Sequence, residues 1–246
     1  MSELLSRIGI GAATVDTRLP STVTAGETVT ATVDVAGGDA EQTVERIYFA
    51  IRTRYESEDT SGVATVARET LAENFTIDPG EERSFEVDLD VPRETPVTVG
   101  HTEVWVDTGL DVEWAIDPED RDHLDVQPSE RQRTVLDAIE DLGFSLKTAY
   151  PESAPGGLFD SARFMQEFEY LPRSGPYRGD LDELEVVFHP TADALDVRLQ
   201  VDTRGGVLTE LADTDLDERL EQVRVTEDDD VDSVRADIED AIERNL

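Results

Sequence analysis

The sequence predicts a mainly β protein of two antiparallel β-sandwich domains, with a short linker helix between them and a helix near the C-terminus. Three observations predict this class. Apolar and polar residues alternate over many short segments, as they do in strands that bury one face. Turn-forming Gly, Pro and Asp residues separate these segments. Helical spacing of apolar residues occurs mainly in two segments, 129–143 and 231–244.

The first half of the chain consists of short strand-like segments. Alternation predicts strands over residues 28–35, 47–52, 85–91, 104–106 and 110–116. The clearest of them places Phe85, Val87 and Leu89 on one face and acidic residues on the other. Turn signals at Gly26, Gly37–Gly38, Asp78–Gly80 and Pro92 separate the strands. This spacing predicts a β-sandwich over residues 1–128.

The periodicity then changes to that of a helix. Ser129 and Gln132 have the spacing of a capping box, and Gly143 supplies a stop. The apolar residues at helical spacing are Val135, Leu136, Ile139 and Leu142. We therefore expect a linker helix over residues 129–143, which places a domain boundary there.

Strand patterns resume after this helix. They cover residues 144–150, 164–170, 184–188, 195–201 and 219–225 and predict a second β-sandwich over 144–246. The segment from Val231 to Arg244 carries an apolar stripe at helical spacing, with Asp232 as the expected N-cap.

The composition is strongly acidic. The chain of 246 residues contains 58 Asp and Glu and has a formal net charge of −37 at pH 7. Its 21 basic residues include one lysine, Lys147. Self-repulsion would weaken a compact acidic chain in dilute buffer, whereas molar salt shortens the Debye length to about 3 Å. We expect a halophilic source whose cytosol holds molar salt.

The same composition excludes several classes of function. The chain contains no Cys, so disulfides, thiol nucleophiles and thiolate metal sites are impossible. The negative charge disfavours nucleic acid and anionic lipid as partners. We see no signal peptide and no apolar run of membrane-spanning length, so we expect a cytoplasmic protein without integral membrane association.

Three segments resemble a known family. They are GIGAATVDTRL from Gly9, GETVTATVDVAGGDAEQTVERIYFAIRTRYE from Gly26, and VWVDTGLDVEWAIDPEDRDHLDVQPS from Val104. Together they resemble the stage-zero sporulation protein M family of sporulation-control proteins. The third segment is the most specific of the three, and the resemblance covers most of the first predicted domain.

This resemblance implies an arrestin-like fold of two β-sandwiches joined by a short linker. It also implies a soluble regulatory or scaffold protein that binds other proteins and is not an enzyme. The partner proteins are unknown, and a homodimer through edge strands is possible. No cofactor is expected.

The segment Gly109–Val126 contains seven acidic residues, one Arg and one His. Alternation predicts that Leu110, Val112, Trp114 and Ile116 form its buried face. A candidate interdomain polar cluster follows, and its members are Asp117, Asp120, Arg121, Asp122 and Asp125. The guanidinium of Arg121 can bind a carboxylate through two hydrogen bonds. The cluster is a structural ion-pair turn, a conformational latch between domains, or a metal site.

Trp105 breaks the alternation of its strand, because it shares a face with Glu103 and Asp107. It either packs beneath another element or stays exposed as a candidate partner contact. We expect packing.

Other candidate sites are weak. His101, His123 and His189 lack the spacing of a zinc motif, and no G-x-S-x-G or phosphate-binding loop is present. The segment 228–239 has acids at four positions of a calcium loop, but Ser233 replaces the required Gly. With 58 acids such a match is uninformative, and an acidic first turn of a helix explains it.

We therefore predict a non-catalytic regulatory or scaffold protein that acts by protein–protein binding in a high-salt cytosol. A carbohydrate-active hydrolase on a β-sandwich is one alternative, and it requires two carboxylates with separated pKa values. A calcium-binding module is the other.

Overall fold

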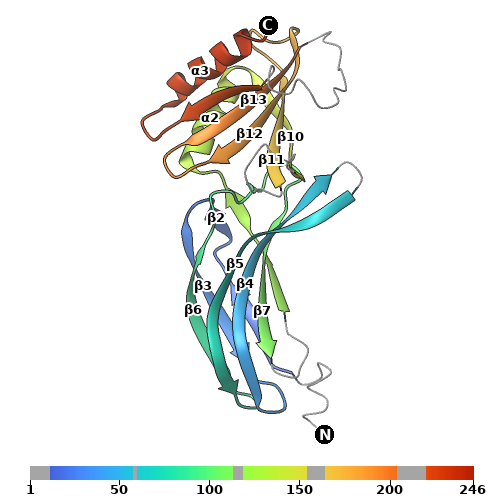
Figure 1. The fold of residues 1–246 in the computed structure, drawn as a ribbon, viewed down its shortest axis with the longest axis vertical. Helices are drawn as coiled ribbons and strands as arrows, with labels where there is room; N and C mark the ends of the chain where they lie inside the picture. Colours follow the sequence, from blue (N-terminus) through green and yellow to red (C-terminus); the bar gives the residue numbers. More distant parts are fainter. Residues whose placement is uncertain (1–11, 58–59, 113–118, 154–163, 204–219) are drawn as a thin grey trace. The chain divides into compact units, whose positions relative to one another are not determined.

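The computed structural model describes residues 12–57, 60–112, 119–153, 164–203 and 220–246. Two compact units emerge from it. Within the described ranges, unit 1 comprises Met1–Arg54, Val63–Thr98 and Glu103–Gln127. Unit 2 comprises Tyr55–Gly62, Val99–Thr102 and Pro128–Leu246. The mainly β class that the sequence predicts is confirmed (Figure 1).

The described part of unit 1 forms three sheets. Its strands are β1 (Thr14–Arg18), β2 (Thr22–Thr24), β3 (Thr28–Ala36), β4 (Gln42–Ser57), β5 (Thr60–Ile77), β6 (Glu82–Asp90), β7 (Val104–Val112), β8 (Glu119–His123) and β9 (Asp125–Gln127). One sheet has the order β1-β3-β6, the second has the order β4-β7-β8 with β5 on the other side of β4, and β2 pairs in parallel with β9.

The inward residues of both larger sheets form one apolar core. Ile47, Phe49 and Ile51 of β4 are fully buried, as are Val33 of β3 and Leu89 of β6. The alternating segments of the sequence therefore place their apolar residues as predicted. The strand β7 differs, because it is buried on both faces. Trp114 and Ile116, expected on its buried face, lie outside the described residues.

The described residues from 128 onward form five antiparallel strands and two helices, which Figure 1 labels in part. The strands are β10 (Phe144–Ser153), β11 (Phe164–Pro172), β12 (Leu181–Pro190), β13 (Leu195–Thr203) and β14 (Leu220–Val225), in this order across the sheet. The helices are α2 (Glu130–Asp141) and α3 (Val231–Glu243). The helices contact each other, and they contact β10 and β14 respectively.

The expected second sandwich is therefore not what the described residues of unit 2 form. Both helices are amphipathic, and their buried residues include Val135 and Ile139 of α2 and Val234 and Ile238 of α3. These apolar stripes supply the second layer that another sheet would have supplied. The helix α2 packs within unit 2 and is not a separate linker.

The ends of both helices are fixed by side chains. The predicted capping box of α2 is confirmed, because Ser129 N–H donates to Oε1 of Gln132 over 2.8 Å and Ser129 Oγ accepts from Gln132 N–H. In α3 the N-cap is Asp230, not Asp232, because Asp230 Oδ1 accepts from Ser233 N–H over 2.9 Å. No helix of the described residues is long and apolar enough to cross a membrane.

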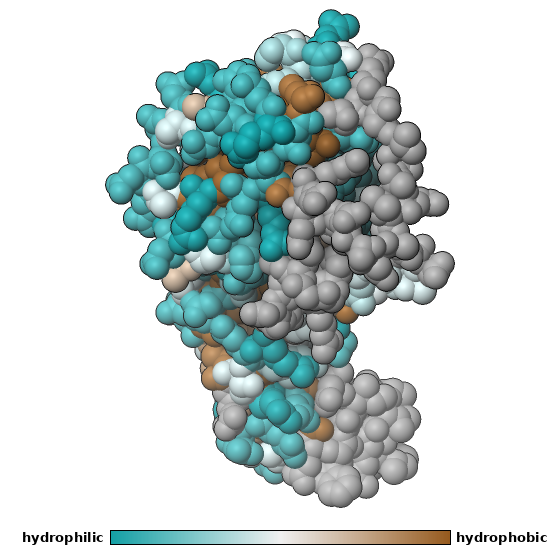
Figure 2. Space-filling model, turned by 45° about the horizontal axis from the view of Figure 1, so that its top comes forward, coloured by the Kyte–Doolittle hydropathy of each residue, from teal (hydrophilic) through white to brown (hydrophobic). Residues whose placement is uncertain are grey.

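The surface matches the acidic composition. Among the described residues, the large apolar side chains that are exposed are Val63 and Leu246. Figure 2 shows a face of the molecule on which hydrophilic residues predominate. Most large apolar side chains of the described residues are buried in the two cores. Their solvent-exposed side chains are therefore mainly polar or charged.

Candidate functional site

The predicted polar cluster is divided by the geometry of β8. This strand pairs antiparallel with β7, which places Arg121 opposite Asp107 and Asp122 opposite Val106. Because successive side chains of a strand project from opposite faces, Arg121 points to one face and Asp120 and Asp122 to the other. The single cluster expected from the sequence is therefore two separate sites.

The remaining members of the predicted cluster do not join Arg121. Asp125 lies in β9, where its Oδ1 accepts from Thr98 Oγ1 over 2.8 Å and from Gln127 Nε2 over 2.9 Å. Asp117 lies outside the described residues. Arg121 meets Asp120 only through its own backbone N–H, over 2.9 Å.

The partner of Arg121 is Asp107, which the sequence analysis did not assign to the cluster. Arg121 Nε donates to Asp107 Oδ1 over 2.7 Å and Nη2 donates to Oδ2 over 3.2 Å. Arg52 Nε lies 3.1 Å from the same Oδ2. Asp107 is only 6% exposed, so two guanidinium groups compensate one buried carboxylate. The hydrogen bond with Asp107 raises the pKa of Arg121.

Trp105 packs, as expected, and is 4% exposed. The guanidinium of Arg121 lies 5.0 Å from the centre of its ring, within the range of a cation–π interaction. Nε1 of Trp105 is buried and makes no hydrogen bond with the described residues. Trp105 therefore supports Arg121 from below and is not an exposed partner contact in this structure.

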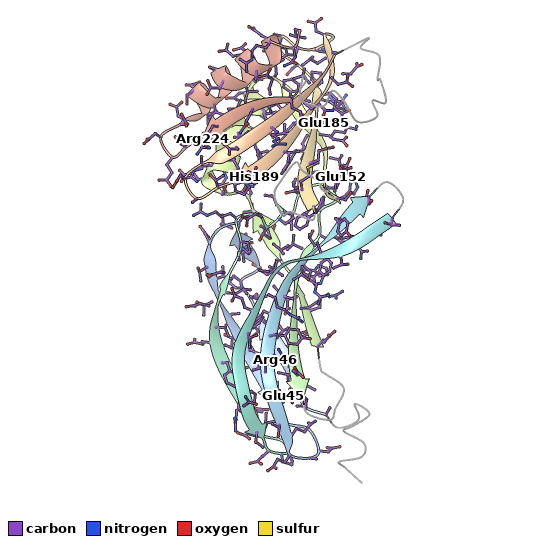
Figure 3. The ribbon with its side chains drawn as sticks, viewed as in Figure 1. Glu45, Arg46, Glu152, Glu185, His189 and Arg224 are labelled. Carbon is purple, nitrogen blue, oxygen red and sulfur yellow. The ribbon has the colours of Figure 1, made fainter. Side chains whose placement is uncertain are left out.

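Further arginines lie on this same face of the β4-β7-β8 sheet. Arg46 Nη2 lies 2.7 Å from Asp111 Oδ2, and Figure 3 labels Arg46 on β4. Arg54 Nε lies 3.5 Å from Glu103 Oε2. The guanidinium of Arg68 on β5 covers the Tyr48 ring at 4.6 Å. We call this surface the arginine face, and its members are Arg46, Arg52, Arg54, Arg68 and Arg121, with Tyr48 and Trp105 beneath them.

The side chains of the arginine face remain accessible. Those of Arg46, Arg54 and Arg121 are 53%, 56% and 56% exposed. Five of the twenty arginines of the chain therefore lie on one sheet face, where Asp107, Asp111 and Glu103 form ion pairs with four of them. The alternation of Arg46, Arg52 and Arg54 along β4 was a signal for it that sequence analysis passed over.

The opposite side of β8 forms a seam with β1. Asp120 Oδ2 accepts from the backbone N–H of Thr17 over 2.8 Å, and Thr17 Oγ1 donates to Thr108 Oγ1 over 2.8 Å. Oδ2 of Asp122 is buried without a hydrogen-bond partner among the described residues. Burial, with the neighbouring Asp120 and Asp16, raises the pKa of Asp122 to about 6.

The histidines do not form a site. Nδ1 of His101 lies 3.0 Å from Thr148 Oγ1 in unit 2, whereas His123 pairs with Trp105 in unit 1. No group of three or more His, Asp or Glu residues in the described part of the chain is arranged to hold a metal ion. The calcium-loop match at 228–239 lies over the N-cap and first turns of α3.

A second charged surface lies on unit 2, and sequence analysis did not find it. It occupies the face of the sheet opposite the helices, and we call it the carboxylate face. Its members are Glu167 and Glu169 of β11, Glu183 and Glu185 of β12, and Lys147 and Tyr150 of β10. The alternating acids of QEFEY and LDELEV were the available signal. Figure 3 labels Glu185 on this sheet.

The carboxyl groups of this face have unequal pKa values. Although burial opposes it, hydrogen bonds from Lys147 and Tyr150 lower the pKa of Glu169. Burial, followed by repulsion from Glu185, raises the pKa of Glu167 to about 8. Burial, followed by repulsion from Glu183, raises the pKa of Glu185 to about 7.

Comparison with known proteins identifies the family. A family model described as SpoOM protein matches residues 1–205, which is well over half of the chain. The chain belongs to this family. Residues 206–246, which include β14 and α3, lie beyond the part that the SpoOM model matches. The resemblance seen in the three sequence segments is thereby confirmed.

Individual SpoOM relatives agree with this assignment. The sporulation-control protein spo0M of Bacillus subtilis strain 168 is 41% identical over 209 residues, which cover 82% of this chain and 80% of the relative. The crystal structure of Spo0M from Bacillus subtilis superposes with a TM-score of 0.85 at 34% identity, covering 96% of this chain and all of the other. The fold described above is thus the Spo0M fold.

Proposed function

We propose that this chain is a regulatory protein of the sporulation-control kind, which acts by binding other proteins and catalyses no reaction. Its family membership supports a regulatory role, since the B. subtilis relative is named for sporulation control. We further propose that it works as a scaffold in a salt-rich cytoplasm. The net charge of −37 supports that setting, because molar salt screens the repulsion.

The arginine face is the observation that carries the proposal of protein binding. Arginine is enriched among the residues that dominate protein interfaces, because its planar fork binds carboxylates through two hydrogen bonds. The exposed guanidinium edges of Arg46, Arg54 and Arg121 offer such donors. The ion pairs with Asp111, Glu103 and Asp107 hold these side chains in place before a partner arrives, which lowers the entropic cost of binding.

The partner that fits this face has a surface of Asp or Glu side chains. In molar salt, long-range attraction between such surfaces is weak. Short bidentate hydrogen bonds and apolar contact with the stems of the arginines would then carry the affinity.

The two alternative functions have less support. A hydrolase needs two carboxyl groups whose pKa values are pushed apart, so that one acts as acid and the other as base. On the carboxylate face the pKa of Glu169 is lowered and that of Glu167 is raised to about 8, but both oxygens of Glu169 are already engaged within the sheet by Lys147 and Tyr150. A calcium site at 228–239 competes with the capping of α3, in which Asp230 already accepts from Ser233 N–H.

The proposal is tested by affinity capture from a native lysate in 2 M KCl, followed by mass spectrometry. The variant replaces three arginines that do not contact Asp107, as R46Q, R54Q and R68Q together. We expect the wild-type chain to recover a defined set of proteins and the triple variant to lose that set. R224Q is the matched control, because Arg224 forms an exposed ion pair with Asp196 in unit 2.

Two outcomes would count against the proposal. If the triple variant recovers the same proteins as the wild type, the arginine face is not the binding surface. If the folded wild-type chain recovers no protein under several growth conditions, the proposal that it acts by binding other proteins is wrong.

A further inference from the structure

The strands β11 and β12 share the shortest antiparallel ladder described in the sheet of unit 2. It pairs Glu167–Tyr170 with Leu184–Val187. The neighbouring ladders, β10 with β11 and β12 with β13, run along almost the whole length of their strands. Few backbone hydrogen bonds therefore hold β11 against β12, and side chains across this junction have a large influence on its stability.

The side chains at this junction repel one another. Glu169 lies directly opposite Glu185, and like charges in this position destabilise a strand pair. Glu167 lies diagonally across from Glu185, and Glu183 is two residues along β12. Four carboxyl groups thus gather on one side of the shortest ladder.

One cation spans the junction. Nζ of Lys147, on β10, lies 2.6 Å from Glu169 Oε2 on β11 and 3.1 Å from Glu183 Oε1 on β12. Tyr150 donates to Glu169 Oε1 over 2.8 Å. The one lysine of the chain therefore links β11 to β12 through their carboxylates, and it compensates the charge of Glu169 and Glu183 only.

Glu167 and Glu185 have no such partner among the described residues. Both are half-buried, and neither forms a hydrogen bond or ion pair with a described residue. The other charged or titratable groups on this face are Tyr150 and Glu152 of β10, His189 of β12, Asp196, Arg198 and Asp202 of β13, and Arg224 of β14. The nearest charges to Glu167 and Glu185 are negative, so ionising both carboxyl groups is unfavourable.

We propose that β11 and β12 form a proton-controlled junction, which is closed while Glu167 and Glu185 carry protons and loosens when they ionise. The raised pKa values of about 8 and about 7 place this change near neutral pH. Burial is the largest cause of both shifts and is insensitive to salt, so part of the effect persists in molar KCl. This inference does not depend on the proposed function.

Hydrogen exchange measured by mass spectrometry in 2 M KCl tests the junction. Protection factors of β11 and β12 peptides, corrected for the intrinsic exchange rate at each pH, are compared between pH 6 and pH 9. We expect protection to fall by roughly tenfold or more in the wild type, as expected for carboxyl groups whose pKa values are raised by folding. The double variant E167Q/E185Q should show constant protection, whereas D237N, an exposed change on α3, should behave as the wild type.

Equal pH profiles for the wild type and E167Q/E185Q would overturn the proposal. Should the double variant fail to fold, carboxyl carbon NMR of the wild-type chain decides the question. Two glutamates that titrate near pH 7 to 8 support the junction, and titration of every glutamate below about pH 5.5 would overturn it.

Discussion

At the residue scale, Asp107 determines the geometry of the arginine face. Its carboxylate is almost fully buried and accepts hydrogen bonds from Arg121 on both oxygens, with Arg52 beside Oδ2. A buried charge of this kind is tolerated only while its partners compensate it. Asp107 therefore brings both guanidinium groups together, and that of Arg121 also lies 5.0 Å from the centre of the Trp105 ring.

We expect D107N to lower the free energy of unfolding by about 2–3 kcal/mol, because two cations lose their common counter-charge. Urea unfolding at a fixed KCl concentration measures this. D111N is the matched control, since Asp111 pairs with the exposed Arg46, and a loss of less than about 1 kcal/mol is expected there. Equal losses in the two variants would contradict the special role of Asp107.

Asp122 gives a second prediction, based on its pKa of about 6. Because folding raises this pKa, the folded state holds the proton more tightly, and the stabilisation is complete below about pH 4. It is lost as the pH rises through about 6. Relative to the wild type, D122N should therefore gain roughly 1–2 kcal/mol in unfolding free energy between pH 4 and pH 7. Parallel pH profiles in urea unfolding would contradict this.

The sequence alone predicted the wrong ion-pair partners for Arg121, and the strand geometry explains why. Its neighbours along the chain are Asp120 and Asp122, and adjacency suggested a cluster. Strand alternation sends these carboxylates to the opposite face, and the register with β7 supplies Asp107. The register between β7 and β8 depends on the packing of the whole sheet. It cannot be predicted from the residues next to Arg121 in the sequence.

At the element scale, the end of α2 depends on Gly143. This residue has a φ of +91°, and a Cβ built on it would lie 2.4 Å from the carbonyl oxygen of Ser174. Gly80 also has a positive φ, of +70°, but nothing lies within 4 Å of its Cβ position. An alanine at Gly80 would therefore meet backbone strain alone, whereas an alanine at Gly143 would meet both backbone strain and a steric clash.

We expect G80A to lower the free energy of unfolding by about 1 kcal/mol, because alanine is strained in the left-handed conformation. G143A should cost at least about 2–3 kcal/mol, because the chain after α2 must also move away from Ser174. Thermal unfolding of both variants in 2 M KCl makes the comparison. A G143A variant no less stable than G80A would show that the turn has room for a side chain.

The elements found from the sequence are those with an uninterrupted pattern. The segments 85–91 and 195–201 alternate without interruption and are strands, and the capping box at Ser129 marks the start of α2. The long strand β5 was missed, because its alternation is interrupted by Arg68, Glu69 and Glu73. The second layer of unit 2 was misjudged because an amphipathic helix and a second sheet cover an apolar sheet face equally well.

At the scale of the whole molecule, the net charge of −37 predicts a strong dependence of stability on salt. Repulsion among the carboxylates is strong in dilute buffer and is screened within a few ångströms in molar KCl. We expect the melting temperature to rise by roughly 10 °C or more between 0.1 M and 2 M KCl. Circular dichroism melts across a KCl series measure this, and equal melting temperatures at both ends would remove the argument for a salt-rich setting.

The proposed function requires that this Spo0M family member presents its arginine face to a partner protein. Hydrogen exchange on the chain, free and bound to a partner recovered by capture, tests it most directly. We predict that binding slows exchange in peptides from β4 and β8, and that peptides from β13 and β14 are unchanged. Protection confined to unit 2, with β4 and β8 unaffected, would contradict the claim.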